Sequence, residues 1–320
     1  MTMDQSIGKG ERTIKSCSYV WTFLACSVSS VFATTTKPIC VEIASGYRED
    51  TLRLSLEETT ASSLIYEERY DSISYGVTAV QLEKLYRDMY LRASSSFSYI
   101  GKGALHQSPI FTDQGSIDLD FTFTTSSLAM DVDIGGGYLV SLTPNKQYEV
   151  SFGPLLRFLY FWQILARKPV EDLSLEGSYR SFLPKDLQIN RWGFVIGPVF
   201  SLEPTPYFAF KAIYGYAFLS TKTTVQSAFT SETGRKIVNE SRLNTSSSHA
   251  QLGQVEVKIA ASSAVQLAAK ADIAYYFTGL QQGQNRQTVQ ENTIQSSVLD
   301  ISYRMRQTSY RILAKIDWMW

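Results

Sequence analysis

The sequence is poor in the residues on which metal sites and nucleophilic catalysis depend. Its 320 residues include only two histidines, His106 and His249, and three cysteines. No Cys-x-x-Cys or His-Glu-x-x-His spacing occurs, so we predict no metal site. A Ser-His-Asp set cannot be assembled from the sequence, because serines are abundant whereas histidines are nearly absent. We therefore expect no metal and no cofactor.

An excess of charge of one sign is also missing. The 30 lysines and arginines balance 30 aspartates and glutamates, and the isoelectric point is about 6.8. Domains that bind nucleic acid carry a basic stripe and have a high isoelectric point. We expect no nucleic-acid partner.

The third absence concerns long hydrophobic runs. Beyond the N-terminal segment, no apolar run approaches the roughly 18 residues that a membrane-spanning helix needs. Only helices and closed barrels satisfy every backbone hydrogen bond inside a lipid bilayer. A membrane protein with this sequence must therefore cross the bilayer as a closed β-barrel.

The N-terminal segment has the three parts of a secretory signal peptide. Basic residues precede a mostly apolar or small run, residues 19–33, which ends in Val31-Phe32-Ala33. We predict that residues 1–33 are a signal peptide cleaved after Ala33, and that residues 34–320 are an outer-membrane β-barrel domain.

Cleavage at this position would also decide which cysteines remain in the mature chain. Cys17 and Cys26 would leave with the signal, so Cys40 would remain alone and no intramolecular disulfide is expected. The stretch Phe23-Leu24-Ala25-Cys26 is also similar to a lipoprotein cleavage site, although the apolar stretch before it is short.

Aromatic residues and two-residue alternation are abundant. Tyrosine and phenylalanine number 19 and 17, which suits the aromatic girdles of a membrane barrel. In the last eleven residues, apolar and aromatic side chains from Tyr310 to Trp320 alternate with Arg311, Lys315 and Asp317. This pattern is typical of the closing strand of a membrane barrel, with an edge strand of a soluble sandwich as the alternative.

The same alternation recurs along the chain. It predicts nine further strands, at about residues 40–57, 71–86, 89–104, 128–142, 148–162, 191–202, 208–218, 254–259 and 265–277. In the first of them the apolar positions change parity at Leu52, which predicts a bulge near Arg48 to Asp50. The fold class predicted is all-β, a transmembrane antiparallel up-and-down β-barrel of about ten strands, with twelve as the alternative.

The predicted connections alternate in length. Long ones are expected at about residues 58–70, 105–126, 164–186, 223–247 and 281–300, and short ones at 87–88, 143–147, 203–206 and 261–264. Long loops at one rim and tight turns at the other are the outer-membrane arrangement, with both termini on the periplasmic side.

Alternation also assigns the two faces of the wall. The lipid-facing aromatic girdle is predicted to contain Tyr75, Tyr138, Trp162, Trp192, Phe210, Tyr275, Trp318 and Trp320. The predicted lumen-lining residues are Arg92, Asp131, Asp133, Glu149, Arg157, Arg191, Lys211, Lys270, Asp272 and Arg311. Because the signs nearly balance in a narrow space, we predict a salt-bridged plug, with a narrow solute path as the alternative.

One possible catalytic set lies at the outer rim. A ten-stranded barrel with long external loops is similar in layout to the omptin proteases, which pair an Asp-x-Asp with an Asp-x-His around an activated water. The corresponding residues would be Asp118, Asp120 and His249, but Ser247 stands where the family has the acid before its histidine. The histidine would lack the group that orients it.

The first hundred residues resemble another family. The stretches are Gly46-Tyr47-Arg48-Glu49-Asp50 with Leu52 and Leu54, Tyr70-Asp71-Ser72-Ile73 with Gly76-Val77 and Gln81-Leu82, and Asp88-Met89-Tyr90-Leu91-Arg92-Ala93 before Gly101 and Gly103. They are similar to the Protochlamydia outer membrane protein family of environmental chlamydiae. Members carry a Trp-Lys step before the second strand, where this sequence has Tyr66-Glu67-Glu68-Arg69. The resemblance implies a surface barrel without an established enzyme activity.

These observations favour a non-enzymatic outer-membrane β-barrel protein, which serves as an envelope structural or surface protein or as a narrow channel. The omptin-like protease and a general porin are the alternatives. The expected partners are outer-membrane lipid and, through the C-terminal strand, the outer-membrane assembly machinery.

Overall fold

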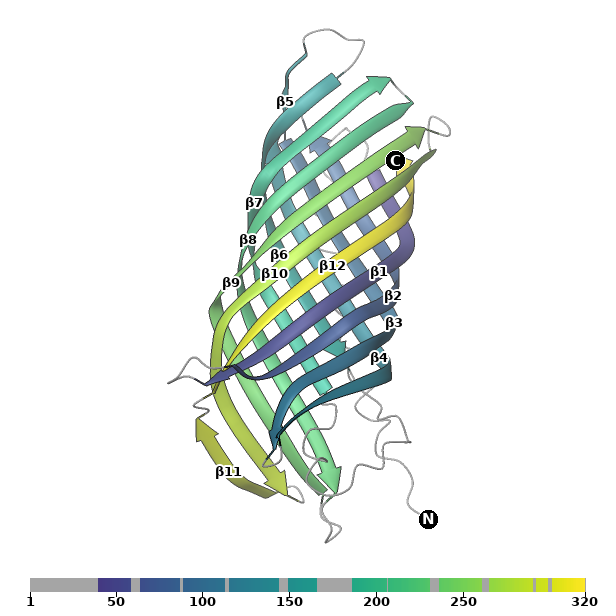
Figure 1. Cartoon of the computed structure of the whole chain (residues 1–320). Coiled ribbons are helices and arrows are strands. Elements are labelled where there is room, and N and C mark those ends of the chain that lie inside the picture. The colour runs from purple at the N-terminus through teal and green to yellow at the C-terminus, as the bar shows by residue number, and fades with distance from the viewer. Residues whose placement is uncertain are drawn as a thin grey trace.

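The computed structural model contains one antiparallel β-sheet that closes on itself (Figure 1). It describes residues 40–58, 64–86, 89–112, 115–143, 149–165, 186–205, 207–230, 236–260, 265–289, 292–298 and 301–319. Among these residues there is no helix of the length and hydrophobicity that a membrane crossing needs.

Twelve strands make up the described sheet. They are β1 (Cys40–Glu58), β2 (Leu64–Tyr86), β3 (Met89–Thr112), β4 (Gly115–Tyr138), β5 (Val140–Ser141), β6 (Glu149–Leu165), β7 (Asp186–Thr205), β8 (Phe208–Thr230), β9 (Lys236–Ala260), β10 (Val265–Val289), β11 (Asn292–Val298) and β12 (Ile301–Met319). Ten of them form the wall, in the order β1-β2-β3-β4-β6-β7-β8-β9-β10-β12, and β12 closes the ring by pairing with both β10 and β1. The predicted fold class, an antiparallel barrel of about ten strands, is confirmed.

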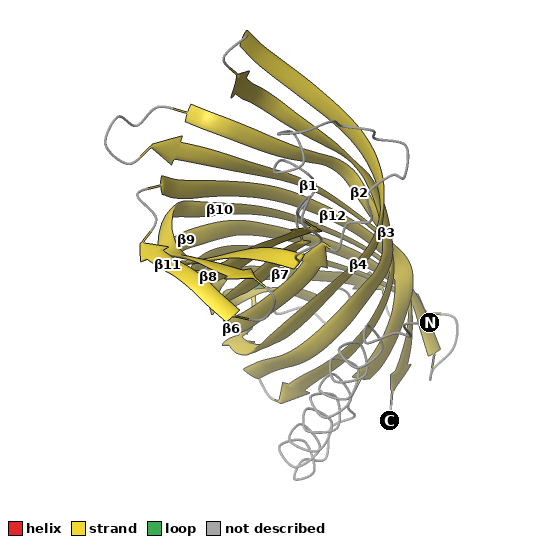
Figure 2. Ribbon diagram, turned by 90° about the horizontal axis from the view of Figure 1, so that it is seen from below, coloured by secondary structure: helices red, strands yellow, loops and turns green. Residues whose placement is uncertain are grey.

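The two rims of the barrel differ. Cys40 pairs with Met319, so both ends of the wall lie at one rim, together with the short connections (top of Figure 1). We call this the short-turn rim. At the opposite rim, which we call the hairpin rim, paired strands continue past the barrel and β11 folds back on β10 (Figures 1 and 2).

Two segments predicted as loops are largely extended hairpins. β3 and β4 stay paired to Thr112 and Gly115, and β8 and β9 stay paired to Thr230 and Lys236. In the β8–β9 hairpin the sequence is largely polar at successive positions, which hides the two-residue period although the backbone pairing continues. In β4 the period is present at Ile117, Leu119, Phe121 and Phe123, and the loop prediction missed it.

The predicted bulge in β1 is wrong. β1 pairs with β12 residue for residue from Cys40 to Glu58. The irregularity lies in β2, which has an extra residue opposite the step from Asp50 to Leu52, near Ser72 with its φ of 51°. Leu52 is buried like Arg48 and Asp50, at the same parity, so the strand does not turn over. The interior itself changes from charged to apolar at this level.

Candidate functional site in the barrel lumen

The lumen is filled by side chains from alternate positions of the wall. At the hairpin rim this filling is hydrophobic. The residues of this apolar layer are Leu52, Leu54, Tyr70, Ile73, Tyr75, Ala129, Phe161, Leu165, Leu187, Ile189, Val225, Leu243 and Met305. They come from eight wall strands and are almost completely buried, so apolar side chains fill much of the lumen at this level.

Two arginines lie beneath the apolar layer, against the faces of its aromatic rings. The guanidinium of Arg48 lies 5.2 Å from the ring centroid of Phe161, and that of Arg191 lies 5.3 Å from the same centroid. Arg191 also lies 4.6 Å from the ring centroid of Tyr276. At this distance a cation is attracted to the ring electrons, and the attraction strengthens where water is excluded.

Asp50 connects these arginines to the rest of the layer. Its Oδ1 accepts a 2.8 Å hydrogen bond from Arg48 Nε, and its Oδ2 accepts bonds of 3.0 Å from Gln163 Nε2 and 3.1 Å from Gln307 Nε2. Gln307 also accepts a 2.5 Å bond from Arg191 Nη1. The Asp50 network, as we call these five residues, joins β1, β6, β7 and β12 across the lumen and ties them together rigidly.

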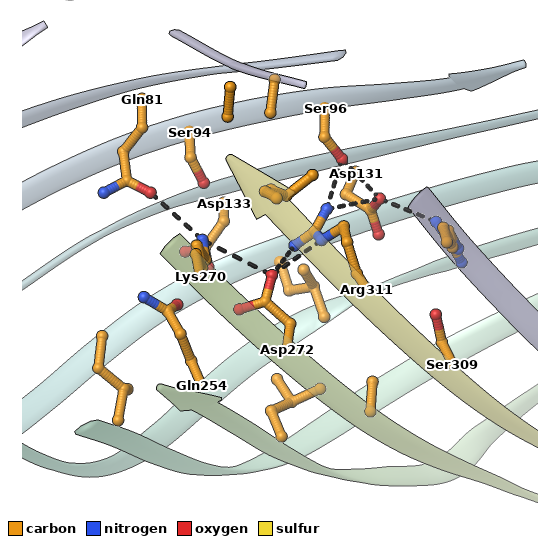
Figure 3. A pocket seen from close by; sticks show the side chains of 18 of the residues that line it. Gln81, Ser94, Ser96, Asp131, Asp133, Gln254, Lys270, Asp272, Ser309 and Arg311 are labelled. Carbon is orange, nitrogen blue, oxygen red and sulfur yellow. Dashed lines mark hydrogen bonds and ion pairs between the residues drawn. The ribbon is translucent and has the colours of Figure 1, made fainter. Parts of the chain in front are cut away.

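A small polar cavity lies next to the Asp50 network, toward the short-turn rim (Figure 3). Its volume is about 90 Å³, which corresponds to a few water molecules. Arg311 projects into it and donates to Asp272 Oδ2 at 2.8 and 2.7 Å and to Ser96 Oγ at 2.7 Å. Ser96 donates in turn to Asp131 at 2.9 Å, and Asp131 also accepts from Arg48 at 3.0 Å. The cavity is thus bounded by paired charges.

A second set of charges lies in the lumen toward the short-turn rim. Lys258 Nζ lies 2.7 Å from Glu42 Oε1 and 3.1 Å from Glu256 Oε1. Lys315 also bridges Glu42 and Glu256, and Lys211 Nζ lies 2.7 Å from Glu83 Oε2. These residues form the Lys-Glu cluster, in which each cation contacts a carboxylate from another strand of the wall.

Comparison with known proteins supports the architecture. No protein-family model and no curated protein matches the chain. Among solved structures, the outer membrane protease OmpT from Escherichia coli is similar, with a TM-score of 0.60 at 8% identity over 90% of this chain and 99% of that chain. The toluene transporter TodX from Pseudomonas putida has a TM-score of 0.30 at 9% identity, over 89% and 91% of the two chains.

The chain has the fold of a bacterial outer-membrane β-barrel. At 8% identity the likeness to OmpT extends to the fold alone. Membership of the Protochlamydia outer membrane protein family stays a prediction.

The structure places most of the predicted luminal residues in the interior. These are Arg92, Asp131, Asp133, Arg157, Arg191, Lys211, Lys270, Asp272 and Arg311. Arg157 Nη1 lies 2.5 Å from Asp133 Oδ2, and Arg92 Nη1 donates to Gln254 Oε1 at 3.0 Å. Glu149 is an exception, because it stands at the first residue of β6 and is exposed at the short-turn rim.

The predicted aromatic girdle needs one correction. Tyr138, Trp192 and Tyr275 are exposed on the outer face, and Trp162 and Phe210 are partly exposed there. Tyr75 is wrongly predicted as lipid-facing: its side chain is 2% exposed, and its hydroxyl accepts a 2.8 Å bond from Gln163. It faces inward because the interior is apolar at this level. The side chains of Trp318 and Trp320 lie outside the described residues.

The structure describes one residue of the proposed rim protease set, His249, together with its surroundings. The imidazole lies on the outer face, between the rings of Tyr216 and Phe277 at centroid distances of 5.8 and 4.8 Å. Its neighbours Ser248 and Ala250 are buried in the interior. The side chains of Asp118 and Asp120 lie outside the described residues. The orientation of His249 does not suit a base in the barrel mouth.

Sequence reasoning missed the two glutamines of the Asp50 network. A signal for them exists, because Gln163 shares the parity of Arg157 on β6 and Gln307 shares the parity of Arg311 on β12. Their common acceptor could not be found this way. Asp50 lies 113 positions from Gln163 and 257 from Gln307, and only the closed barrel brings them together.

Proposed function

We propose that the protein is a non-enzymatic outer-membrane β-barrel whose lumen is closed, and that it acts as a structural or surface-exposed component of the envelope. The observation that carries this proposal is the cross-lumen Asp50 network beneath the apolar layer. A channel would need these contacts to be absent or displaced along its whole length.

The closure has three parts in series. A solute that entered at the hairpin rim would first meet the apolar layer, then the Asp50 network, and finally the Lys-Glu cluster. Separating buried, paired charges leaves each of them desolvated, which costs several kcal/mol by the usual figure of about 3–5 kcal/mol for one broken pair. The cavity between them, about 90 Å³, holds no more than small solutes or water.

The outer surface supports a membrane location. Large apolar side chains are exposed around the wall, including Ile312 at 65% and Phe218 at 62%. A continuous apolar belt of this kind is unfavourable in water and is covered by lipid in outer-membrane barrels. In the proposed orientation the short-turn rim faces the periplasm and the hairpin rim faces outward. The C-terminal strand β12, which closes the ring, is the segment that we propose the assembly machinery recognises.

Conductance measurements test the closed lumen. The protein, purified from outer membranes and shown by heat-modifiable migration to be folded, is inserted into planar lipid bilayers. We expect no conductance steps above the baseline. Regular steps from the unaltered protein would contradict the proposal and favour the narrow channel.

A deliberately opened variant shows that the assay can detect a pore. Phe161→Gly, Arg191→Ser, Lys258→Ser and Lys315→Ser together remove the ring shared by both arginines, one of the two arginines and two cations of the Lys-Glu cluster. We expect conductance steps from this variant if it still migrates as a folded barrel.

A further inference from the structure

The charges that line the small polar cavity are not all paired. Its lining cations are Arg48, Arg92, Arg157, Lys270, Arg311 and Lys315. Its lining carboxylates are Glu42, Asp131, Asp133 and Asp272, and each of them has a cation within 3.0 Å. When carboxylates outside the lining are included, four of the six cations also have a carboxylate within 3.0 Å. The two exceptions are Arg92 and Lys270.

Arg92 is a buried guanidinium without an ion pair. The residue is 3% exposed. Among the described residues it donates one hydrogen bond, from Nη1 to Gln254 Oε1 at 3.0 Å, and its Nε has no acceptor. The charges of Asp133, Glu83 and Asp272 act on Arg92 from beyond ion-pair distance. Each of these carboxylates forms its own ion pair with another cation. A buried charge in this position is strongly unfavourable.

Lys270 is only loosely held. Its Nζ lies 3.6 Å from Asp272 Oδ2 and 3.4 Å from Gln81 Oε1 (Figure 3). Both distances are longer than those of strong charge-assisted hydrogen bonds, and Arg311 holds the same oxygen of Asp272 at 2.7 Å. The like charge of Arg92 also acts on Lys270. Two buried cations therefore lie beside the cavity with little negative charge in contact with them.

Gln254 supplies a third hydrogen-bond donor near these cations. Its backbone pairs with that of Asp272, two residues from Lys270, and its side chain lies beside Lys270 at the cavity (Figure 3). Because Oε1 accepts from Arg92, the orientation of the amide is fixed, and Nε2 is left as a donor. This nitrogen has no acceptor among the described residues, although Gln254 is only 9% exposed.

The size of the cavity suits a small ion. Its volume of about 90 Å³ holds a few water molecules, and a halide is only slightly larger than one of them. Water suits part of the space, because Asp133 Oδ1 and Asp272 Oδ1 have no donor among the described residues. Water carries no charge, however, so it would leave Arg92 without a counter-charge.

We propose that the small polar cavity binds a small monovalent anion, with chloride as the ligand, through Arg92, Lys270 and Gln254. The anion supplies the negative charge that the neighbouring carboxylates give to other cations. Guanidinium, ammonium and amide N–H groups are all donors, as an anion requires. The site does not depend on whether the lumen conducts, so its failure would leave the closed lumen untouched.

Unfolding at constant ionic strength tests the site. The full chain is unfolded by urea in lipid vesicles while sodium chloride replaces sodium gluconate, whose anion is too large for the cavity. A ligand that binds only the folded state raises the folding equilibrium constant by the factor 1 + [chloride]/Kd. Above Kd, the constant should therefore rise about tenfold for each tenfold rise in chloride. Equal stability in the two salts would overturn the proposal.

Two matched variants separate the site from general effects of salt. Arg92→Gln removes the unpaired cation and should lose the chloride response, while in gluconate it should be at least as stable as the unaltered protein. Arg191→Gln removes another buried arginine, which lies outside the cavity lining against the rings of Phe161 and Tyr276. This control should keep the chloride response. A response that persists in Arg92→Gln, or that disappears equally in both variants, would refute the site.

Bromide locates the ion directly. Crystals of the unaltered protein, refolded and grown in sodium bromide, should give an anomalous scattering peak in the cavity beside Arg92, Lys270 and Gln254. Water alone in the cavity, or bromide only at the protein surface, would contradict the proposal. If Arg92→Gln does not fold, Lys270→Gln takes its place in the unfolding experiment and should weaken the chloride response.

Discussion

Replacing Asp50 by asparagine should destabilise the barrel more than almost any other single isosteric change. The Asp50 carboxylate is fully buried and accepts hydrogen bonds from Arg48, Gln163 and Gln307. Asparagine keeps the shape but removes the charge, and its NH₂ group presents donors to side chains that themselves donate. The substitution therefore leaves buried donors without an acceptor.

The size of the stability loss depends on which ion-pair and hydrogen-bond partners Arg48, Gln163 and Gln307 retain in the Asp50→Asn variant. Breaking a buried ion pair costs about 3–5 kcal/mol when the other charge is left alone. Arg48 keeps its ion pair with Asp131 at 3.0 Å, which makes the loss of stability smaller. The hydrogen bonds that Gln163 and Gln307 donate to position 50 become weaker, which makes the loss larger. We expect the free energy of unfolding to fall by about 2–4 kcal/mol, within the range for hydrogen bonds to buried charges.

Urea unfolding of the protein in lipid vesicles, followed by tryptophan fluorescence, measures this loss. The matched control is Glu240→Gln, which removes a carboxylate from the pair with the exposed Arg242 and should change stability little. If Asp50→Asn costs no more than Glu240→Gln, the Asp50 network does not hold the barrel together and the reasoning is refuted.

Two further changes test the wall and the apolar layer. Ile196→Arg, near the middle of the outer face of β7, should lower the free energy of unfolding by about 2–4 kcal/mol, whereas Phe208→Arg near the short-turn rim should cost about 0–1 kcal/mol. Equal costs in vesicle unfolding would contradict the membrane placement. Phe161→Ala should cost about 3–5 kcal/mol, because it leaves a cavity and removes the ring beside Arg48 and Arg191. A loss below about 1 kcal/mol in the same assay would mean that this ring does not support the lumen.

Much of the wall could be predicted because lipid imposes a strict two-residue period. Arg157 and Lys211 face inward, and Phe194 and Tyr214 face outward, as alternation alone predicts. The period is reliable there because the two faces meet solvents of opposite polarity.

The prediction failed where the two faces do not differ in polarity. Leu52 and Tyr75 are apolar yet luminal, since the lumen at the hairpin end is a packed core. In the extended β8–β9 hairpin beyond Gln226, polar residues occupy successive positions and the period disappears although pairing persists. A sequence pattern reports which solvent a face meets, and it cannot tell lipid from a dry interior.

Contacts across the lumen and across strands were beyond sequence reasoning for a different reason. The Asp50 network joins residues from distant strands, and Arg53 stands opposite Arg69 and Arg306 only through the register of β1 with β2 and with β12. A shift of one residue in either pairing would change these neighbours. Only the closed barrel fixes these neighbours.

Cysteine labelling tests the closed lumen most directly. In a Cys17→Ser/Cys26→Ser/Cys40→Ser background, Ser309→Cys places a thiol beside the small polar cavity, between the apolar layer and the Lys-Glu cluster. A charged, water-soluble maleimide too large for a cavity of about 90 Å³ should leave this thiol unmodified in the folded protein and modify it after denaturation. Rapid modification in the folded barrel, from either rim, would show an open path and contradict the closed lumen.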